Sequence, residues 1–472
     1  MGVDATALQR RLEEVLPPEQ ISVEPRVLQS NSEDYAWFSN VLDEVLDGCR
    51  ADAVAWPHDE QQLAGLLAAA YDLRVPVTIR GGGTGNYGQC VPLNGGLVIN
   101  TMRMNRVLEV GDGYARVQAG VKLVDLDRAA QPTGQEIRIY PSTYLTATVA
   151  GFVCGGSGGI GSISHGMLVD GNVLAATVYP VDADPQPHTV GGAGLLLYIH
   201  AFGTTGVLSD VTVPLAPLRT WEQAVFSFPD ILRCHAFCME LLDDASIDKR
   251  LLSTVEPGVA RYFSRARVPF ATDRTSALLM VGEGQVDRVA ALAARHGGTL
   301  DTHLPRDSKV RLSDFTWNHT TAWAKKADPS VTYLQAMFDA ERFEEQMRAI
   351  KAAYGDEFQM HGEYARWGGG PFVGSLPLVQ YKGREHLSAM IEFMEGIGVS
   401  IANPHTYVLE EGSRTDNSAE LAVEKRRNDP AGLLNPGKLA AAGRPDGEQQ
   451  ALAKESSMGL ARVRRSLSDL NV

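Results

Sequence analysis

The chain has 472 residues, of which 44% are hydrophobic and 21% charged, the balance of a soluble globular protein. Its length predicts about two to three domains with room for sizeable cores. The formal net charge of −14 disfavours non-specific binding to nucleic acid or to an anionic membrane surface. No apolar run approaches the roughly 20 residues of a membrane span. We therefore expect a cytoplasmic protein that binds neither nucleic acid nor membrane.

The five cysteines are scattered, odd in number and not preceded by a secretory leader, so we expect reduced thiols. Cys234 and Cys238 are spaced like a metal half-site. However, the same spacing puts both thiols on one face of a helix, and no second pair follows. We interpret this segment as a buried helix face and predict no metal site.

The first half of the chain mixes helices with short apolar strands. In chain order, the patterns predict a polar helical region over 1–48, a strand over 51–56, a helix over 59–73, strands over 75–79, 97–99 and 114–119, and a helix over 121–128. Further along the chain, the patterns predict strands over 173–181 and 211–215, helices over 286–296 and 340–354, and an exposed amphipathic helix over 449–470. After Pro217, longer amphipathic helices alternate with strands rich in Phe, Tyr and Val, and this change predicts a domain boundary near residue 217.

Two glycine-dense stretches, 80–88 and 151–161, carry most of the functional information. Glycine costs conformational entropy on folding, so dense runs mark backbone that must approach something closely. Two runs indicate one long, phosphate-bearing ligand held at more than one point. A dinucleotide is the leading interpretation.

The first stretch contains a G-x-G-x-x-G pattern over 83–88, which in a dinucleotide-binding Rossmann fold must open a helix. Here Pro92 and a glycine pair follow, and then another strand, so the NAD interpretation fails. What remains is a strand–loop–strand whose amides can cradle phosphate. A second pattern over 432–438 resembles an ATP-binding loop, but Leu439 replaces the magnesium-binding Ser or Thr, which excludes that interpretation as well.

Four segments in order, 79–85, 141–162, 203–212 and 429–438, resemble the vanillyl-alcohol oxidase/p-cresol methylhydroxylase (PCMH) family of FAD-dependent oxidoreductases. The resemblance implies an α+β fold: a PCMH-type FAD-binding domain of two α/β subdomains, and a cap domain with an antiparallel sheet flanked by helices. The domains implied are 1–217 for the FAD-binding domain, 218–420 for the substrate-binding cap, and 421–472 for a C-terminal segment that returns to the FAD domain. Many relatives dimerise, so a homodimer is one expected state.

The resemblance also implies how FAD is held. The first loop would wrap the pyrophosphate through backbone amides, the second would line the ribityl chain and flavin ring, and the C-terminal segment would return towards the flavin. The FAD-binding residues implied are Arg80, Gly81, Gly82, Gly83, Thr84, Gly85, Asn86, Tyr87, Gly88, Pro141, Ser142, Thr143, Thr148, Gly151, Gly155, Gly156, Ser157, Gly158, Gly161, Ser162, Gly206, Val207, Asn435 and Lys438.

Family members often attach FAD covalently through a His in the first loop, sometimes with a Cys in the second. Thr84 occupies the place of that His, and Tyr144 falls where the Cys would be. Cys154 is nearby but out of register. We therefore expect non-covalent FAD, although attachment through a histidine elsewhere stays open.

The activity that the resemblance implies is hydride transfer from a small alcohol-type substrate, aromatic alcohols included, to flavin N5, with O2 or a carrier as electron acceptor. Such chemistry needs a group that takes the heteroatom proton, and histidine suits this task. We expect His405 to be the base or the substrate anchor, with Tyr407 and His361 as alternatives. Arg366 is a candidate for binding a substrate carboxylate or phenolate. His319 is a further candidate, because it lies, like His361 and His405, in a segment that mixes aromatic and polar residues.

One departure from the family narrows the substrate. Lactate- and hydroxyglutarate-oxidising relatives carry a His-x-Gly-Asp-Gly-Asn-x-His metal site, and the segment that begins at His361 does not continue in that way. This argues against a metal-assisted 2-hydroxy-acid dehydrogenase. A 2-hydroxy acid or a sugar alcohol stays as the alternative substrate, and a catalytically inactive flavin-binding protein as the remaining reading.

Overall fold

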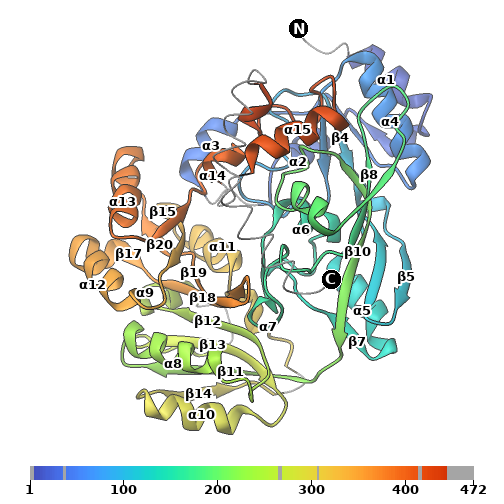
Figure 1. The fold of residues 1–472 in the computed structure, drawn as a ribbon. Helices are drawn as coiled ribbons and strands as arrows, with labels where there is room; N and C mark the ends of the chain where they lie inside the picture. The colour runs from blue at the N-terminus through green and yellow to red at the C-terminus, as the bar shows by residue number, and fades with distance from the viewer. Residues whose placement is uncertain (1–4, 36–38, 264–267, 306–307, 413–416, 444–472) are drawn as a thin grey trace.

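The computed structural model describes residues 5–35, 39–263, 268–305, 308–412 and 417–443. Elements from the two ends of the chain lie side by side at the top of Figure 1, above a large sheet built from the middle of the chain. The helix predicted over 449–470 lies outside the described residues. Within the described part of the chain, none of the helices has the length and apolar character needed to cross a bilayer.

The first sheet is small and holds the start of the first glycine loop. Its strands run in the order β1 (Ile21–Ser22), β2 (Ala53–Ala55), β4 (Leu97–Asn100) and β3 (Val77–Arg80), and the last three are parallel. The helices of this subdomain are α1 (Ala5–Glu13), α2 (Pro25–Ser32), α3 (Asn40–Leu46) and α4 (Glu60–Leu73). Because β4 follows the loop directly, the predicted strand–loop–strand is confirmed.

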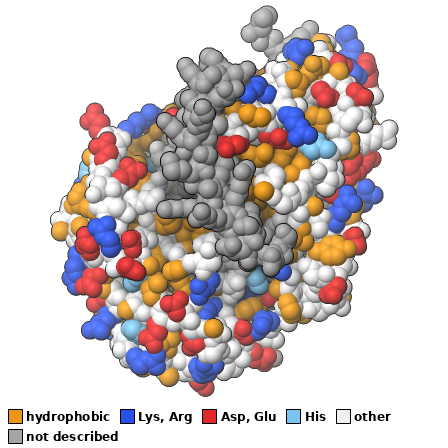
Figure 2. All heavy atoms as spheres, viewed as in Figure 1, with side chains coloured by type: hydrophobic (Ala, Val, Ile, Leu, Met, Phe, Trp, Pro, Cys, Tyr) orange, Lys and Arg blue, Asp and Glu red, His pale blue; other side chains and the backbone are white. Residues whose placement is uncertain are grey.

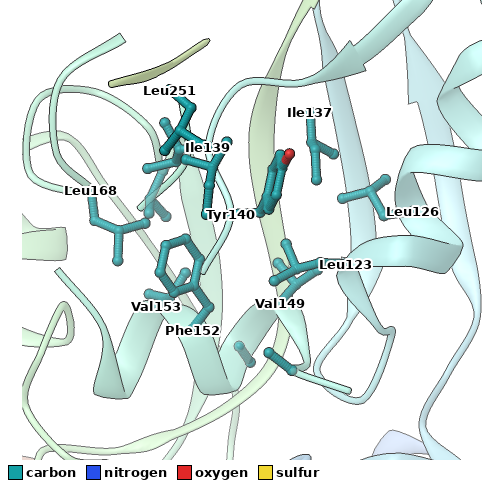
Figure 3. Close-up of a cluster of buried hydrophobic side chains, with 14 of the residues drawn as sticks. Leu123, Leu126, Ile137, Ile139, Tyr140, Val149, Phe152, Val153, Leu168 and Leu251 are labelled. Carbon is teal, nitrogen blue, oxygen red and sulfur yellow. The ribbon is translucent and has the colours of Figure 1, made fainter. Parts of the chain in front are cut away.

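The second sheet has six strands in the order β5 (Val107–Gly111), β6 (Tyr114–Gln118), β10 (Val207–Pro217), β8 (Ala175–Tyr179) and β9 (His188–Gly191), with β7 (Gln135–Ile137) paired to the end of β10. Two helices accompany it, α5 (Leu123–Ala130) and α6 (Val149–Gly155), and the short α7 (Ser162–His165) lies against the third sheet, described next. Figure 3 shows apolar side chains of α5 and α6 gathered around Tyr140. This core fixes the segment from Tyr140 to α6, which carries the second set of predicted FAD contacts.

The third sheet is antiparallel, with eight strands in the order β14 (Thr299–His303), β11 (Trp221–Phe228), β13 (Thr275–Gly282), β12 (Lys249–Val255), β18 (His361–Trp367), β19 (Gly370–Ser375), β16 (Gln335–Phe338) and β21 (Ser400–Ala402). A smaller sheet joins β15 (Val331–Tyr333), β20 (Leu378–Gln380) and β17 (Phe358–Gln359). The helices of this part are α8 (Ile231–Asp243), α9 (Pro257–Ala260), α10 (Val286–Arg295), α11 (Asn318–Ala327), α12 (Phe343–Tyr354) and α13 (Arg384–Gly396).

Side-chain alternation gives this large sheet two different faces. On β11, Phe226 packs with the cluster that includes α8, α10, α12 and α13, while its neighbour Val225 packs on the opposite side with the core of the second sheet. Cys234 and Cys238 are both buried on α8, so the predicted helix face is confirmed. The expected α+β fold, with a helix-flanked antiparallel sheet beside two smaller subdomains, is confirmed.

The C-terminal segment returns to the first sheet through α14 (Leu409–Gly412) and α15 (Ser418–Asn428), seen in orange and red at the top of Figure 1. The amide of Val77 donates to the Leu433 carbonyl at 2.8 Å, and the Asn435 amide donates back to the Val77 carbonyl at 2.6 Å. This attachment lies at the start of β3, the strand that leads into the first glycine loop. The predicted boundary near 217 falls in the short link between β10 and β11, and the division into domains stays a prediction.

Acidic and basic side chains are interspersed over the face shown in Figure 2, with hydrophobic ones scattered among them. The described side chains on this face therefore form no broad basic patch of the kind that holds a nucleic-acid backbone.

Candidate functional site

A cavity of about 820 Å³ lies where both glycine stretches meet the large sheet. Most of the predicted FAD-binding residues line it: Gly81, Gly82, Gly83, Thr84, Gly85, Asn86, Tyr87, Pro141, Ser142, Thr143, Thr148, Gly151, Gly155, Gly156, Ser157, Gly158, Gly206 and Val207. The others lie behind this surface: Arg80, Gly88, Gly161, Ser162, Asn435 and Lys438. One continuous wall thus joins segments that are far apart in the sequence.

The first glycine loop presents unused backbone donors to this cavity. The amides of residues 81–85 find no hydrogen-bond acceptor in the described chain, whereas the next ones do: the Gln89 side chain accepts from the amides of Asn86 at 3.1 Å and Tyr87 at 2.9 Å. Consecutive unpaired amides form a concave donor surface that suits an anion. The residues present therefore fit the pyrophosphate of a dinucleotide.

The far side of the loop is held by buried charges. Asp34 accepts from the Gly88 amide at 2.6 Å. Lys438 is fully buried, and its ammonium donates to the carbonyls of Gly88, Gln89 (3.0 Å) and Val91 (2.6 Å). Burial lowers the pKa of Lys438 to about 8, while the nearby Asp34 carboxylate acts in the opposite direction. Lys438 thus positions the loop from behind, in contrast to its predicted approach to the flavin.

Asn435 acts in the same way as Lys438. Its side-chain amide donates to the Gln89 carbonyl at 3.0 Å and to the Phe202 carbonyl at 2.6 Å. Asn435 therefore ties the first glycine loop to the segment that precedes β10. Both C-terminal residues that sequence reasoning placed near the flavin lie outside the cavity wall.

The second glycine stretch uses its glycines in two ways. A Cβ on Gly159 or Gly161 would meet the carbonyl oxygens of Tyr140 and Arg138 at 2.1 and 2.0 Å, so these two glycines allow close backbone packing. Gly155 is different, because a Cβ there would come no closer than 3.9 Å to any other group, the Gln89 amide nitrogen. Gly155 lines the cavity, and no packing contact within the described protein requires a glycine at this position.

The positions considered for covalent attachment differ in placement. Thr84 lines the cavity, whereas Tyr144 donates to the Asp127 carboxylate at 2.8 Å and lies outside the lining. Cys154 lines the cavity, but burial raises the pKa of its thiol to about 12, which keeps it protonated. A protonated thiol is a poor nucleophile. The expectation of non-covalent FAD stays a prediction.

The cap side of the cavity is built on β18. Glu363 and Trp367 line the cavity, and His361 lies on the same side of the strand. Residues in between face α8: Tyr364 contacts His235, and Arg366 donates to the Leu242 carbonyl at 2.9 Å. Arg366 is therefore on the wrong face of the strand to bind a substrate carboxylate in this cavity.

Glu363 is an ionisable residue of the cavity wall that sequence reasoning missed, as are Asp170 and His200. Its Oε1 accepts from Ser253 Oγ at 3.0 Å and from the Trp317 amide at 2.6 Å, and it lies 2.7 Å from His361 Nε2. The carboxylate is thus buried and held by three neighbours, yet the residue lines the cavity. The sequence did hold one signal for this residue. Side chains of a strand alternate between its two faces, so Glu363 lies on the same face as His361, and both turn to the cavity side if one of them does.

The other predicted catalytic residues lie outside the cavity wall. His405 is buried with Nδ1 at 2.8 Å from Ser39 Oγ, and burial lowers its pKa to about 4, so its imidazole is neutral at pH 7. Tyr407 packs with Leu42, Leu46 and Val91. Burial also lowers the pKa of His319, whose neighbours Trp317 and Asn318 do line the cavity. Of the five candidates, two contact residues of the cavity wall: His361 contacts Glu363, and His319 contacts the backbone of Ser142.

Comparison with known proteins agrees with this geometry. Residues 51–193 match the model of a family described as an FAD binding domain. Residues 51–193 of this chain therefore form an FAD-binding domain of the PCMH type. The matched range contains both glycine stretches, and the predicted FAD cofactor is confirmed.

Relatives and solved structures extend the comparison. An uncharacterised FAD-linked oxidoreductase of Mycobacterium tuberculosis is 34% identical over 47% of this chain and 52% of its own, so the alignment spans about half of that relative. A glycolate oxidase subunit of Escherichia coli is 24% identical over 82% of this chain and 83% of its own. A 4-ethylphenol oxidase from Gulosibacter chungangensis superposes with a TM-score of 0.66 at 17% identity, covering 93% of this chain and 97% of its own. The last likeness shows the fold.

Proposed function

We propose that this protein is an FAD-dependent oxidoreductase that takes hydride from a small alcohol-type substrate, aromatic alcohols included. One observation carries the proposal: the cavity that fits FAD continues to the cap, where it is lined by Trp317, Trp367 and Phe372 as well as Glu363. A pocket of aromatic rings with few polar groups is typical of sites that orient small molecules.

The chain's own residues have separable tasks in this proposal. The amides of residues 81–85 hold the pyrophosphate, and the bound FAD supplies the two-electron oxidising chemistry. The aromatic side chains of the cap exclude water and orient the substrate. Gln335 and Asn318, which also line the cavity, supply hydrogen bonds to its polar atoms.

A 2-hydroxy acid is the second candidate substrate, because glycolate oxidase and D-lactate dehydrogenase are among the similar proteins. Binding a carboxylate normally uses an Arg or Lys. The described residues that line the cavity include neither, and their acidic members are Glu363 and Asp170. This charge balance favours the alcohol.

The test is anaerobic flavin reduction by a panel: benzyl alcohol, a sugar alcohol, glycolate and D-lactate. We expect the visible absorption of the flavin to bleach with an alcohol and to change far less with the two acids. Bleaching by glycolate or D-lactate alone would make the acid the substrate, and no bleaching by any compound would leave a flavin-binding protein without this activity. Reoxidation by air or by an artificial carrier then identifies the class of electron acceptor.

A further inference from the structure

We infer that Glu363 accepts the hydroxyl proton of the substrate and that its charge keeps carboxylates out of the cavity. The inference rests on the proposed function and narrows its substrate to uncharged alcohols. It begins from the place of Glu363 in the sheet. Glu363 lies on β18 between Ser253 of β12 and Gly374 of β19, both cross-strand partners. Gly374 also lines the cavity, so the neighbouring strand places no side chain beside the carboxylate.

The hydrogen bonds of Glu363 are asymmetric. Ser253, the Trp317 amide and His361 Nε2 all address Oε1, at 3.0, 2.6 and 2.7 Å. Oε2 has no hydrogen-bond partner in the described chain. This oxygen is not sealed off from the cavity, so a ligand there can donate a hydrogen bond to it. One oxygen is therefore fixed and the other is available at a cavity wall.

The contacts of His361 assign its tautomer. Thr320 donates its hydroxyl hydrogen to the Phe315 carbonyl at 2.8 Å, so at 3.2 Å from His361 Nε2 it can only accept. Nε2 therefore carries the hydrogen, which it shares between Thr320 and Glu363. Nδ1 is buried without a partner in the described chain. The Nε2–H group therefore donates to Glu363 Oε1 and holds that side chain in place.

The backbone at Trp317 is a second, independent sign of function. Its φ of 51° and ψ of −141° are a conformation that a side chain of this size rarely adopts. The same residue gives its amide to Glu363 Oε1 and its side chain to the cavity. The unusual backbone conformation thus directs one residue to both the carboxylate and the ligand space.

The charges around the cavity support the exclusion of carboxylates. Asp170 also lines the cavity, but the amides of Gly368 and Met167 occupy its two oxygens at 3.1 and 2.8 Å. Within the described lining, no Lys or Arg opposes the charge of Glu363. A carboxylate ligand would therefore meet uncompensated like charge, whereas an alcohol would meet a hydrogen-bond acceptor.

Oxidation of the alcohol removes one proton and one hydride from the substrate. Glu363 Oε2 takes the hydroxyl proton as the substrate O–H bond breaks, and the carbon–oxygen double bond forms. The hydride leaves the same carbon with its electron pair for oxidised FAD, which is the oxidant. The products are a carbonyl compound, reduced FAD and protonated Glu363, which returns its proton to solvent after product release.

The experiment uses the FAD-loaded full chain and a Glu363→Gln variant, which keeps the size of the side chain and removes the charge. Glu256→Gln is the matched control, because Glu256 is a half-buried structural carboxylate held by the Met360 amide and Lys351 away from the cavity. Two measurements are made: equilibrium binding of benzyl alcohol and of benzoate, followed by the flavin difference spectrum, and anaerobic flavin reduction by the panel alcohol that bleaches the wild-type protein.

We expect Glu363→Gln to retain FAD and alcohol affinity within about threefold, to bind benzoate at least about tenfold more tightly than wild type, and to reduce flavin at least about 100-fold more slowly. The control variant should match wild type in all of these. The inference is overturned if the ratio of benzoate affinity to alcohol affinity is the same in Glu363→Gln and wild type, or if neither protein detectably binds either compound. It is also overturned if Glu363→Gln reduces its flavin at a rate within threefold of wild type. The binding measurement needs no turnover. It therefore still decides the place of Glu363 if no panel alcohol bleaches the flavin and the proposed function fails.

Discussion

Replacing Lys438 with Met tests whether this buried lysine builds the FAD-binding loop. The substitution keeps the length of the side chain but removes three hydrogen bonds to the carbonyls of Gly88, Gln89 and Val91. Hydrogen bonds from a charged group contribute about 1.5–3 kcal/mol each, so the three together contribute roughly 4–9 kcal/mol. The pKa of Lys438 falls from 10.5 to about 8 through burial. Holding the charge there therefore costs about 3 kcal/mol, which Met recovers. The expected net loss of unfolding free energy is about 1–6 kcal/mol.

The loss should appear in the cofactor as well as in the fold. Because the released carbonyls belong to the loop whose amides face the cavity, we expect FAD to bind at least about tenfold more weakly to the Lys438→Met apoprotein. Urea unfolding and an equilibrium FAD titration measure the two effects. Lys326→Met is the control, since its side chain lies on α11 without a hydrogen bond to the loop. Wild-type stability together with wild-type FAD affinity in Lys438→Met would refute the positioning role.

Four further predictions follow from the described contacts. Gly155→Ala should leave the apoprotein about as stable as wild type but weaken FAD at least about tenfold in an equilibrium titration, because Gly155 lines the cavity and the new Cβ would come no closer than 3.9 Å to any other group of the protein. Gly396→Ala, at an open helical glycine, is the control, and equal FAD affinity in both variants would remove Gly155 from the cofactor site. In the folded chain the pKa of His405 is about 4 rather than 6.5, so the unfolded state takes up the proton first as pH falls, and about 3 kcal/mol of stability should be lost between pH 6.5 and pH 4. Urea unfolding at a series of pH values should show a smaller loss of stability in His405→Asn. The same dependence of stability on pH in the variant and the wild type would contradict the assignment. Arg250→Met breaks a buried ion pair with Glu136 at 2.6 Å and should lower the free energy of unfolding, measured in urea, by about 3–5 kcal/mol. Arg348→Met breaks an exposed ion pair and should lower it by less than about 1 kcal/mol. Similar losses in both variants would contradict the argument that burial makes the difference. Acid precipitation should release the flavin into the supernatant, because Thr84 and Tyr144 stand where linkages would form, and flavin retained in the pellet would show a covalent bond elsewhere.

The backbone of the cofactor site could be predicted from sequence because the determining signals are local. Pro92 and the glycines at 95 and 96 exclude a helix after the first glycine loop, and the structure has β4 there, parallel to β3. The glycine stretches likewise identified most of the cavity wall on the FAD side. Such signals act over a few residues, so tertiary contacts did not override them.

The residues of the substrate side could not be placed in this way, because their orientation depends on long-range packing. Arg366 and Glu363 are three residues apart on β18, and only the packing of α8 against one face decides which of them meets the cavity. Lys438 and Asn435 reach the back of the first loop, whereas the resemblance implied a return towards the flavin. Which side of the loop they reach is set by the bridge between Val77 and Leu434, which the sequence does not reveal.

The central claim, that FAD in this cavity takes hydride from an alcohol, is tested most directly by an isotope effect on anaerobic flavin reduction. The alcohol that bleaches the flavin is compared with the same compound deuterated at the carbon that bears the hydroxyl group. The account predicts slower bleaching with the deuterated compound in the wild-type protein, because that C–H bond breaks as the flavin is reduced. Equal rates with both compounds under single-turnover conditions, or a purified protein that carries no flavin and binds none, would contradict it.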